Sequence, residues 1–142
     1  MFRVSILSAA LLASLALPSR AAELTIEVIG ANPARGQFLI SVFDRPETWM
    51  KHPVATRAPT VAADGAGAAK FSLPAGSYAI ALIHDANGNG KTDTNAFGIP
   101  TEAFGFSNGA RAHFGPPAFG KSAFTLTEPG GRLTISLDRA KR

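Results

Sequence analysis

The feature that most restricts the fold of this chain is a hydrophobic pattern with a period of two, which recurs along much of its length. Successive side chains of a β-strand point to opposite faces, so this period describes strands with one buried face and one face in water. The pattern occurs in residues 24–28, 37–42, 69–73, 124–127 and 132–137. Residues 77–84 are apolar on both sides, which is typical of a central strand.

Turn-forming residues separate these runs, and the short turns at 74–76 and 129–131 favour β-hairpins. A further strand is expected near residues 60–62, and only residues 46–56 leave room for a short helical turn. The predicted fold is therefore all-β. We expect a single-domain antiparallel β-sandwich, immunoglobulin-like or transthyretin-like, with about seven strands.

One long segment, residues 94–121, matches no strand pattern. It contains five phenylalanines beside many glycines: Phe97, Phe104, Phe106, Phe114 and Phe119. A disordered polar segment would lack such side chains, because large rings favour burial. The sequence therefore predicts a long ordered Phe/Gly-rich loop whose rings are packed and whose glycines allow sharp turns.

The first residues have the layout of a secretory signal peptide. A short positive start precedes an uncharged apolar run at residues 4–17, and the small residues Ser19 and Ala21 follow at the two positions that a signal peptidase reads. The predictions are a signal peptide at residues 1–21, a mature β-sandwich domain at residues 22–142, and a periplasmic or extracellular location. No other stretch approaches the length of a membrane-spanning helix, so no span is expected after cleavage.

Composition excludes several classes of function. The chain has no cysteine, which rules out disulfides, thiolate metal sites and cysteine nucleophiles. Its formal charge is +4, but the basic residues are scattered apart from a short cluster at residues 139–142. The sequence therefore predicts no nucleic-acid partner.

The most informative polar motif is HDANGNGKTD, residues 84–93, which follows the central strand directly. Calcium loops place oxygen ligands at alternate positions, then a glycine for the bend and a backbone carbonyl after it. Side-chain oxygens, Gly90 and one backbone carbonyl occupy these places. The predicted metal ligands are Asp85, Asn87, Asn89, the Lys91 carbonyl and Asp93.

Two departures from helix-loop-helix calcium sites limit this prediction. A strand precedes the motif, and Ala96 stands at the twelfth position, where those sites carry a glutamate. Glu102 would supply the missing ligand if the chain folds back. With few carboxylates, calcium affinity should lie in the weak range of about 10⁻⁴ to 10⁻³ M. The alternative reading is a turn alone, since Asn-Gly pairs favour tight turns.

A longer block carries a family resemblance. The segment HDANGNGKTDTNAFGIPTEAFGFSNGARAHFGPPAFGKSAF, preceded by LPAGSYAIALIHD, resembles a bacterial exported family catalogued as domain of unknown function 2141. The resemblance covers essentially the whole mature chain. It implies an exported protein with a β-sandwich fold, and it implies no reaction.

Two functions of different classes remain open. The first is a non-catalytic, calcium-stabilised module of the cell envelope that presents the Phe/Gly loop to a protein or a glycan. Its candidate ligand-binding residues are His84, Glu102, Phe106, Asn108, Arg111 and His113. The alternative is a small metal-dependent or carboxylate-based hydrolase acting on an envelope glycan. Its candidate residues are His84, His113, Asp85, Asp93, Glu102 and Ser107.

Overall fold

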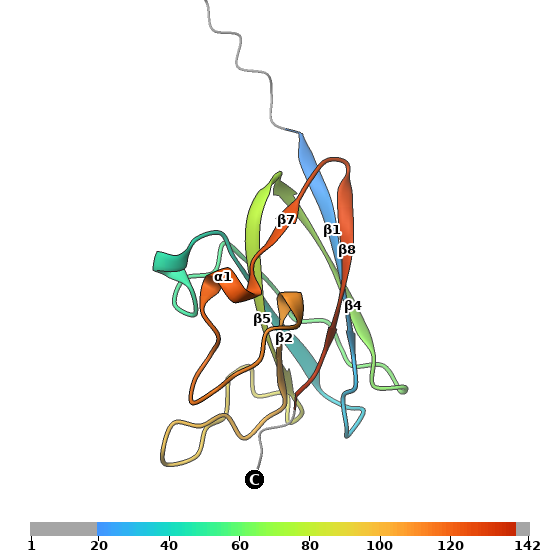
Figure 1. Ribbon diagram of the computed structural model, residues 1–142. Coiled ribbons are helices and arrows are strands. Elements are labelled where there is room, and N and C mark those ends of the chain that lie inside the picture. The colour runs from blue at the N-terminus through green and yellow to red at the C-terminus, as the bar shows by residue number, and fades with distance from the viewer. Residues whose placement is uncertain (1–19, 139–142) are drawn as a thin grey trace, which may run out of the picture.

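The computed structural model describes residues 20–138, which form eight strands arranged in two sheets (Figure 1). The prediction of an all-β chain is confirmed. Almost all of the predicted signal peptide, residues 1–19, lies outside the described part of the chain, as do residues 139–142. Within residues 20–138, no helix has both the length and the apolar character needed to cross a membrane.

The smaller sheet has three strands, with β1 in its centre. Its members are β4 (Gly67–Pro74), β1 (Ala21–Ile29) and β8 (Gly130–Ser136). β1 is antiparallel to β4 but parallel to β8. The prediction of a wholly antiparallel arrangement was therefore wrong for β8, because this strand enters from the other sheet.

The larger sheet is built around β5, the strand that the sequence marks as central. Its strands are β3 (Ala55–Arg57), β2 (Gln37–Phe43), β5 (Gly76–Asp85), β6 (Phe104–Phe106) and β7 (Phe124–Leu126). One edge of β5 pairs with β2. The opposite edge pairs with β7 at residues 76–78 and with β6 at residues 81–83.

Neither predicted hairpin forms, because both short turns carry the chain from one sheet to the other. β4 and β5 are separated by Ala75 alone and lie in different sheets. β7 and β8 also lie in different sheets (Figure 1). At the first crossing the Tyr78 hydroxyl donates a 2.7 Å hydrogen bond to the Pro74 carbonyl, the arrangement of a tyrosine corner. At the second, a Cβ on Gly130 would lie 2.0 Å from the Glu23 carbonyl oxygen.

The main hydrophobic core lies between the two sheets and uses the residues that the alternation marks as apolar. Both sheets contribute fully buried side chains: Leu24, Ile26, Val28, Phe38, Ile40, Val42, Phe71, Ile80 and Leu82. The strand expected near residues 60–62 does not form. Thr60 makes only an isolated bridge to Gln37, although Val61 is buried in the core.

A second hydrophobic cluster covers the outer face of the larger sheet. We call its cover, residues 107–123, the lid; it contains η2 (Ser107–Gly109) and α1 (Phe119–Ser122). Phe106 and Phe119 pack there against Trp49, which follows the short helix η1 (Pro46–Thr48). The helical turn expected within residues 46–56 therefore forms, whereas α1 was not predicted.

The prediction that all five rings of residues 94–121 are packed was wrong for two of them. Phe104, Phe106 and Phe119 join the second cluster. Phe97 is 88% exposed and Phe114 is 115% exposed. Both exposed rings stand beside a glycine, at turns where Gly98 and Phe114 have positive φ.

Candidate functional site

The candidate site begins where β5 ends, at Asp85. This side chain is fully buried, and its carboxylate accepts three hydrogen bonds. The donors are the Gln37 Nε2 at 2.8 Å, the Asn89 N–H at 3.1 Å and the Gly90 N–H at 2.8 Å. Asp85 therefore fixes the backbone of the turn that follows it, and a carboxylate with about four lone-pair positions keeps one of them free.

These contacts determine the ionisation of Asp85. Burial raises the pKa of this carboxyl, but the hydrogen bonds from the Gln37 side chain and from the N–H groups of Gly90 and Asn89 outweigh burial. The net pKa of Asp85 consequently lies below its ordinary value. The carboxylate remains charged and holds the turn in place.

The turn brings two amide side chains onto one carboxylate. The Oδ1 atoms of Asn87 and Asn89 accept the N–H groups of Asn89 and Lys91, which closes two successive Asx turns. The Nδ2 atoms of Asn87 and Asn89 both donate to Asp93, each with a shortest distance of 2.8 Å. Asp93, which is half-buried, is thus the centre of this group of side chains.

The chain returns to the same group at Glu102. Its Oε2 accepts the Asp93 N–H at 3.1 Å, and the Thr101 N–H donates to the Asp93 carbonyl at 2.9 Å. Burial raises the pKa of Glu102, and the neighbouring charges of Asp93 and Asp85 raise it further. We call the side chains of Asp85, Asn87, Asn89, Asp93 and Glu102 the acidic loop cluster.

The two histidines of the predicted site have different surroundings. His84 is buried, its Nε2 lies 2.8 Å from the Arg35 carbonyl, and its ring packs against Phe38 with centroids 5.6 Å apart. His113 is exposed in the lid. Within residues 20–138, no three side chains of the His, Asp and Glu types converge as a metal centre. The bond to Arg35 gives His84 a structural role at the end of β5.

The remaining predicted ligand-binding residues belong to the second hydrophobic cluster or hold the lid. Phe106 is buried beside Trp49. The Asn108 Nδ2 donates to the Lys121 carbonyl at 3.0 Å, and the Arg111 Nη1 lies 3.4 Å from the Asp138 carboxylate. These residues close the lid, whereas the acidic loop cluster lies in the β5–β6 connection.

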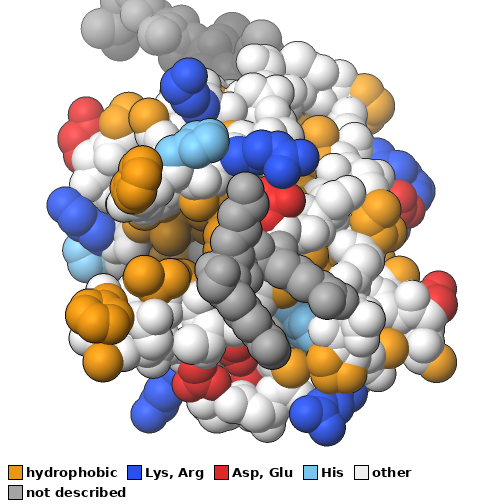
Figure 2. Space-filling model, turned by 60° about the horizontal axis from the view of Figure 1, so that its bottom comes forward, with side chains coloured by type: hydrophobic (Ala, Val, Ile, Leu, Met, Phe, Trp, Pro, Cys, Tyr) orange, Lys and Arg blue, Asp and Glu red, His pale blue; other side chains and the backbone are white. Residues whose placement is uncertain are grey.

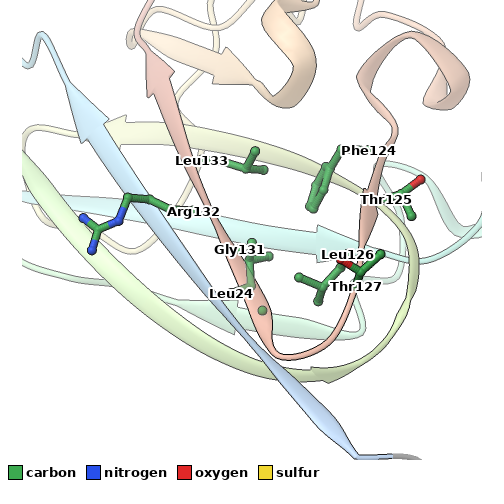
Figure 3. Close-up of a pocket in the computed structure, with 9 residues that line it drawn as sticks. Leu24, Phe124, Thr125, Leu126, Thr127, Gly131, Arg132 and Leu133 are labelled. Atoms are coloured by element: carbon green, nitrogen blue, oxygen red, sulfur yellow. The ribbon is translucent and has the colours of Figure 1, made fainter.

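Two hollows of the surface lie apart from both groups. One, of about 210 Å³, opens between β7 and β8, where Leu24, Leu126 and Leu133 line it and the Arg132 side chain points away (Figure 3). It is smaller than the roughly 300–1,000 Å³ of typical small-molecule sites. The other, of about 430 Å³, is a shallow hollow beside β1 and β4. Neither hollow includes a histidine or a member of the acidic loop cluster.

Sequence reasoning missed Gln37, which fixes the Asp85 side chain from the first position of β2. In the alternating pattern Gln37 is one more polar residue on the outer face of a strand. Only the pairing of β2 with β5, which places Gln37 opposite Asp85, reveals its role. The sequence contains no local signal for that contact.

A family model described as an uncharacterised protein conserved in bacteria, domain of unknown function 2141, matches residues 26–133. The chain belongs to this family. The match includes the acidic loop cluster, the lid and most of both sheets, so the resemblance inferred from the sequence is confirmed. Neither a curated protein nor a solved structure matches the chain.

Proposed function

We propose that this protein is an exported β-sandwich module of the cell envelope that binds one Ca²⁺ weakly through the acidic loop cluster. Its role is to bind a protein or glycan partner or to build structure, rather than to catalyse a reaction. The observation that carries the metal proposal is the meeting of Asp93 and Glu102. The half-buried Glu102 carboxylate accepts the backbone N–H of Asp93, and the pKa of Glu102 is raised by burial and by the nearby charges of Asp93 and Asp85.

The donor set fits a hard cation that binds oxygen. Asp93 and Glu102 would supply carboxylates, and the Lys91 carbonyl remains part of the predicted set. Asn87 and Asn89 would supply amide oxygens only after their amides turn, because their Nδ2 atoms face Asp93 in this structure. Asp85 acts mainly through the backbone, because three N–H groups already occupy its carboxylate. Amide and backbone oxygens favour Ca²⁺ over Mg²⁺, which prefers a small octahedral shell with several waters.

A bound cation would act on the loop electrostatically. In the structure the Nδ2 atoms of Asn87 and Asn89 direct partial positive charge at Asp93. A divalent ion supplies a full countercharge, which removes the repulsion between Asp93 and Glu102. Its binding would hold the β5–β6 connection against the end of β5 and stabilise the folded chain by mass action.

Two further observations support the other parts of the proposal. The layout of residues 1–21 supports export. The tyrosine corner at Tyr78, and two sheets that share one core, support a sandwich of the immunoglobulin-like or transthyretin-like type. The hydrolase alternative gains nothing from His84, whose ring nitrogen is engaged by the Arg35 carbonyl.

The metal proposal is tested by thermal melting with calcium and with a chelator. At 10 mM Ca²⁺ a site with a dissociation constant near 1 mM stabilises the fold by about 1.4 kcal/mol, a shift of several degrees. Asp93→Asn should abolish this shift. Glu102→Gln should raise the melting temperature in chelator, because it removes a carboxylate whose ionisation is disfavoured, and should reduce the response to calcium.

Asp64→Asn is the matched control, since Asp64 also caps a loop through its bond to the Ala66 N–H and lies outside the acidic loop cluster. It should respond to calcium as the unaltered protein does. If the unaltered protein melts identically in calcium and in chelator, or if Asp93→Asn keeps the full shift, the metal proposal is wrong.

A further inference from the structure

Two phenylalanine rings of this protein contribute almost nothing to its own core. Phe97 is 88% exposed, Phe114 is 115% exposed, and Ile99, next to the first ring, is 53% exposed. The other described phenylalanines are buried or half-buried. Single exposed apolar residues are common on protein surfaces, but two fully projecting rings at turn tips are not explained by folding.

The backbone at these tips directs the rings outward. Phe114 has a φ of 54°, in the left-handed region that a bulky side chain rarely adopts, and the His113 N–H closes the turn on the Gly115 carbonyl. Phe97 precedes Gly98, whose φ is 75°, and the Asn95 side chain accepts the Phe97 and Ile99 N–H groups. Strain at a ring that packs on nothing points to a role outside the fold.

Both tips lie at one end of the molecule. In Figure 1 the gold turn that contains residues 94–100 and the orange turn that contains residues 112–116 are both at the lower left. The β1–β2 loop reaches the same lower end, where the Arg35 carbonyl meets His84. Figure 2 brings this end forward and shows hydrophobic, basic and acidic side chains interspersed around the face.

Charged side chains of both signs lie at this end (Figure 2), and the exposed ones include Arg35 and Lys91. Among residues 20–138, neither of these two has a carboxylate within ion-pairing distance. The carboxylates are less accessible, since Asp85 is fully buried and the other two members of the acidic loop cluster are half-buried and hydrogen-bonded. An anionic surface would meet the basic side chains first.

We propose that this end of the molecule docks on the surface of an anionic lipid bilayer, with Phe97 and Phe114 entering the boundary between headgroups and acyl chains. Apolar side chains beside basic ones are the combination that binds such interfaces. The proposal goes beyond the metal site and does not depend on it. The protein would lie on the membrane and would not cross it.

The shape of the surface favours lipid over a protein partner. A ring that projects fully must be surrounded on all sides to be buried, and fluid acyl chains do this without a matching hollow. The two hollows described above, beside β1 and β4 and between β7 and β8, do not include Phe97 or Phe114.

The test measures partition of the purified chain, with its N-terminus determined and identical in every variant, onto phosphatidylcholine vesicles with and without an anionic lipid. The double variant Phe97→Ser, Phe114→Ser should bind at least tenfold more weakly, because burying one such ring favours binding by about tenfold or more. Lys91→Glu should weaken binding to anionic vesicles alone, and added salt should remove that difference.

The matched control is Val54→Ser. Val54 is 48% exposed in the segment after η1, which lies at mid-height in Figure 1, away from the two tips. It should bind as the unaltered protein does, and all variants should melt together because the altered side chains are exposed. Each binding measurement is made in calcium and in chelator, which separates this proposal from the metal site.

Loss of binding in the double variant, under either condition, supports the proposal even if calcium fails to shift the melting temperature. The proposal is overturned if the unaltered protein does not bind vesicles. It is also overturned if the double variant binds equally well, or if it changes only the oligomeric state and thereby identifies a protein contact.

Discussion

At the scale of single residues, Ser107 shows how a side chain completes a sheet. β7 pairs with β5 at residues 76–78 and β6 pairs at residues 81–83, which leaves the Ile80 N–H between two partner strands. The Ser107 Oγ accepts that N–H at 2.8 Å and donates to the Ser122 carbonyl at 2.5 Å. Buried backbone groups must be satisfied, so this hydroxyl replaces the missing strand.

The two buried serines of this contact should respond oppositely to substitution. Ser107→Ala leaves a buried N–H and a buried carbonyl without partners and should cost roughly 1–3 kcal/mol of unfolding free energy. Ser122→Ala removes a buried hydroxyl that has no hydrogen-bond partner and should be neutral or stabilising. Urea denaturation of both variants measures the difference. If both variants lose the same free energy of unfolding, the hydrogen bonds of Ser107 do not stabilise the fold as proposed.

At the scale of elements, the lid depends on Trp49. Its ring stands edge-on to Phe43 at 4.9 Å and to Phe119 at 5.9 Å between centroids, and its Nε1 donates to the Pro117 carbonyl at 2.8 Å. Trp49 therefore joins the outer face of β2 to residues 117–119 of the lid. We expect the lid to open locally when this contact is weakened.

Substitution of Trp49 should open the lid before the sheets unfold. Trp49→Ala should cost about 3 kcal/mol or more, because a large ring is lost from a packed cluster. Trp49→Phe keeps much of the ring contact and loses the bond to Pro117, at a cost of about 1 kcal/mol. Limited proteolysis should show faster cleavage within residues 110–118 in the same order. Unchanged cleavage in Trp49→Ala would mean that other contacts hold the lid.

At the scale of the whole molecule, two carboxyls give metal-free stability opposite dependences on pH. The pKa of Asp85 is lowered from its ordinary 3.8. The stability that its charged form contributes is therefore present above pH 3.8 and is lost as the pH falls through the lower folded-state pKa. The pKa of Glu102 is raised from 4.5. Its ionisation therefore lowers the free energy of unfolding above the folded-state pKa, and this loss disappears as the pH falls below 4.5.

The urea midpoint in chelator should consequently rise as the pH falls from 7 towards 4.5 and should decrease at lower pH. Glu102→Gln should remove the rise, because the glutamine does not ionise. Asp85→Asn should lower stability at neutral pH and weaken the acid-induced loss. If the urea midpoint depends on pH in the same way in the unaltered protein and in both variants, Glu102 and Asp85 do not cause these changes in stability.

Six of the eight described strands could be predicted from the sequence, because a period of two is a local property of the chain, whereas the three-residue strands β3 and β6 could not. β1, β2, β4 and β5 begin and end within three residues of their predicted runs, and Asp85 falls at the strand end where the polar motif starts. Part of the acidic loop cluster could also be approached locally, since Asp85, Asn87 and Asn89 alternate along one turn, whereas Glu102 joins them from further along the chain. Its position directly after β5 follows from the sequence alone.

Strand partners could not be predicted in this way, because alternation tells which side chains are apolar and not which sheet a strand joins. A turn as short as Ala75 suits a hairpin equally well, and only the burial of β4 and β5 in opposite layers made it a crossing. For the same reason, the contacts of Gln37 and Ser107 and the exposure of Phe114 could not be predicted from the local pattern. The sequence by itself determined the longer alternating strands, the lack of cysteine chemistry and the polar loop. Only the tertiary structure decided which groups meet, since those contacts join residues distant along the chain.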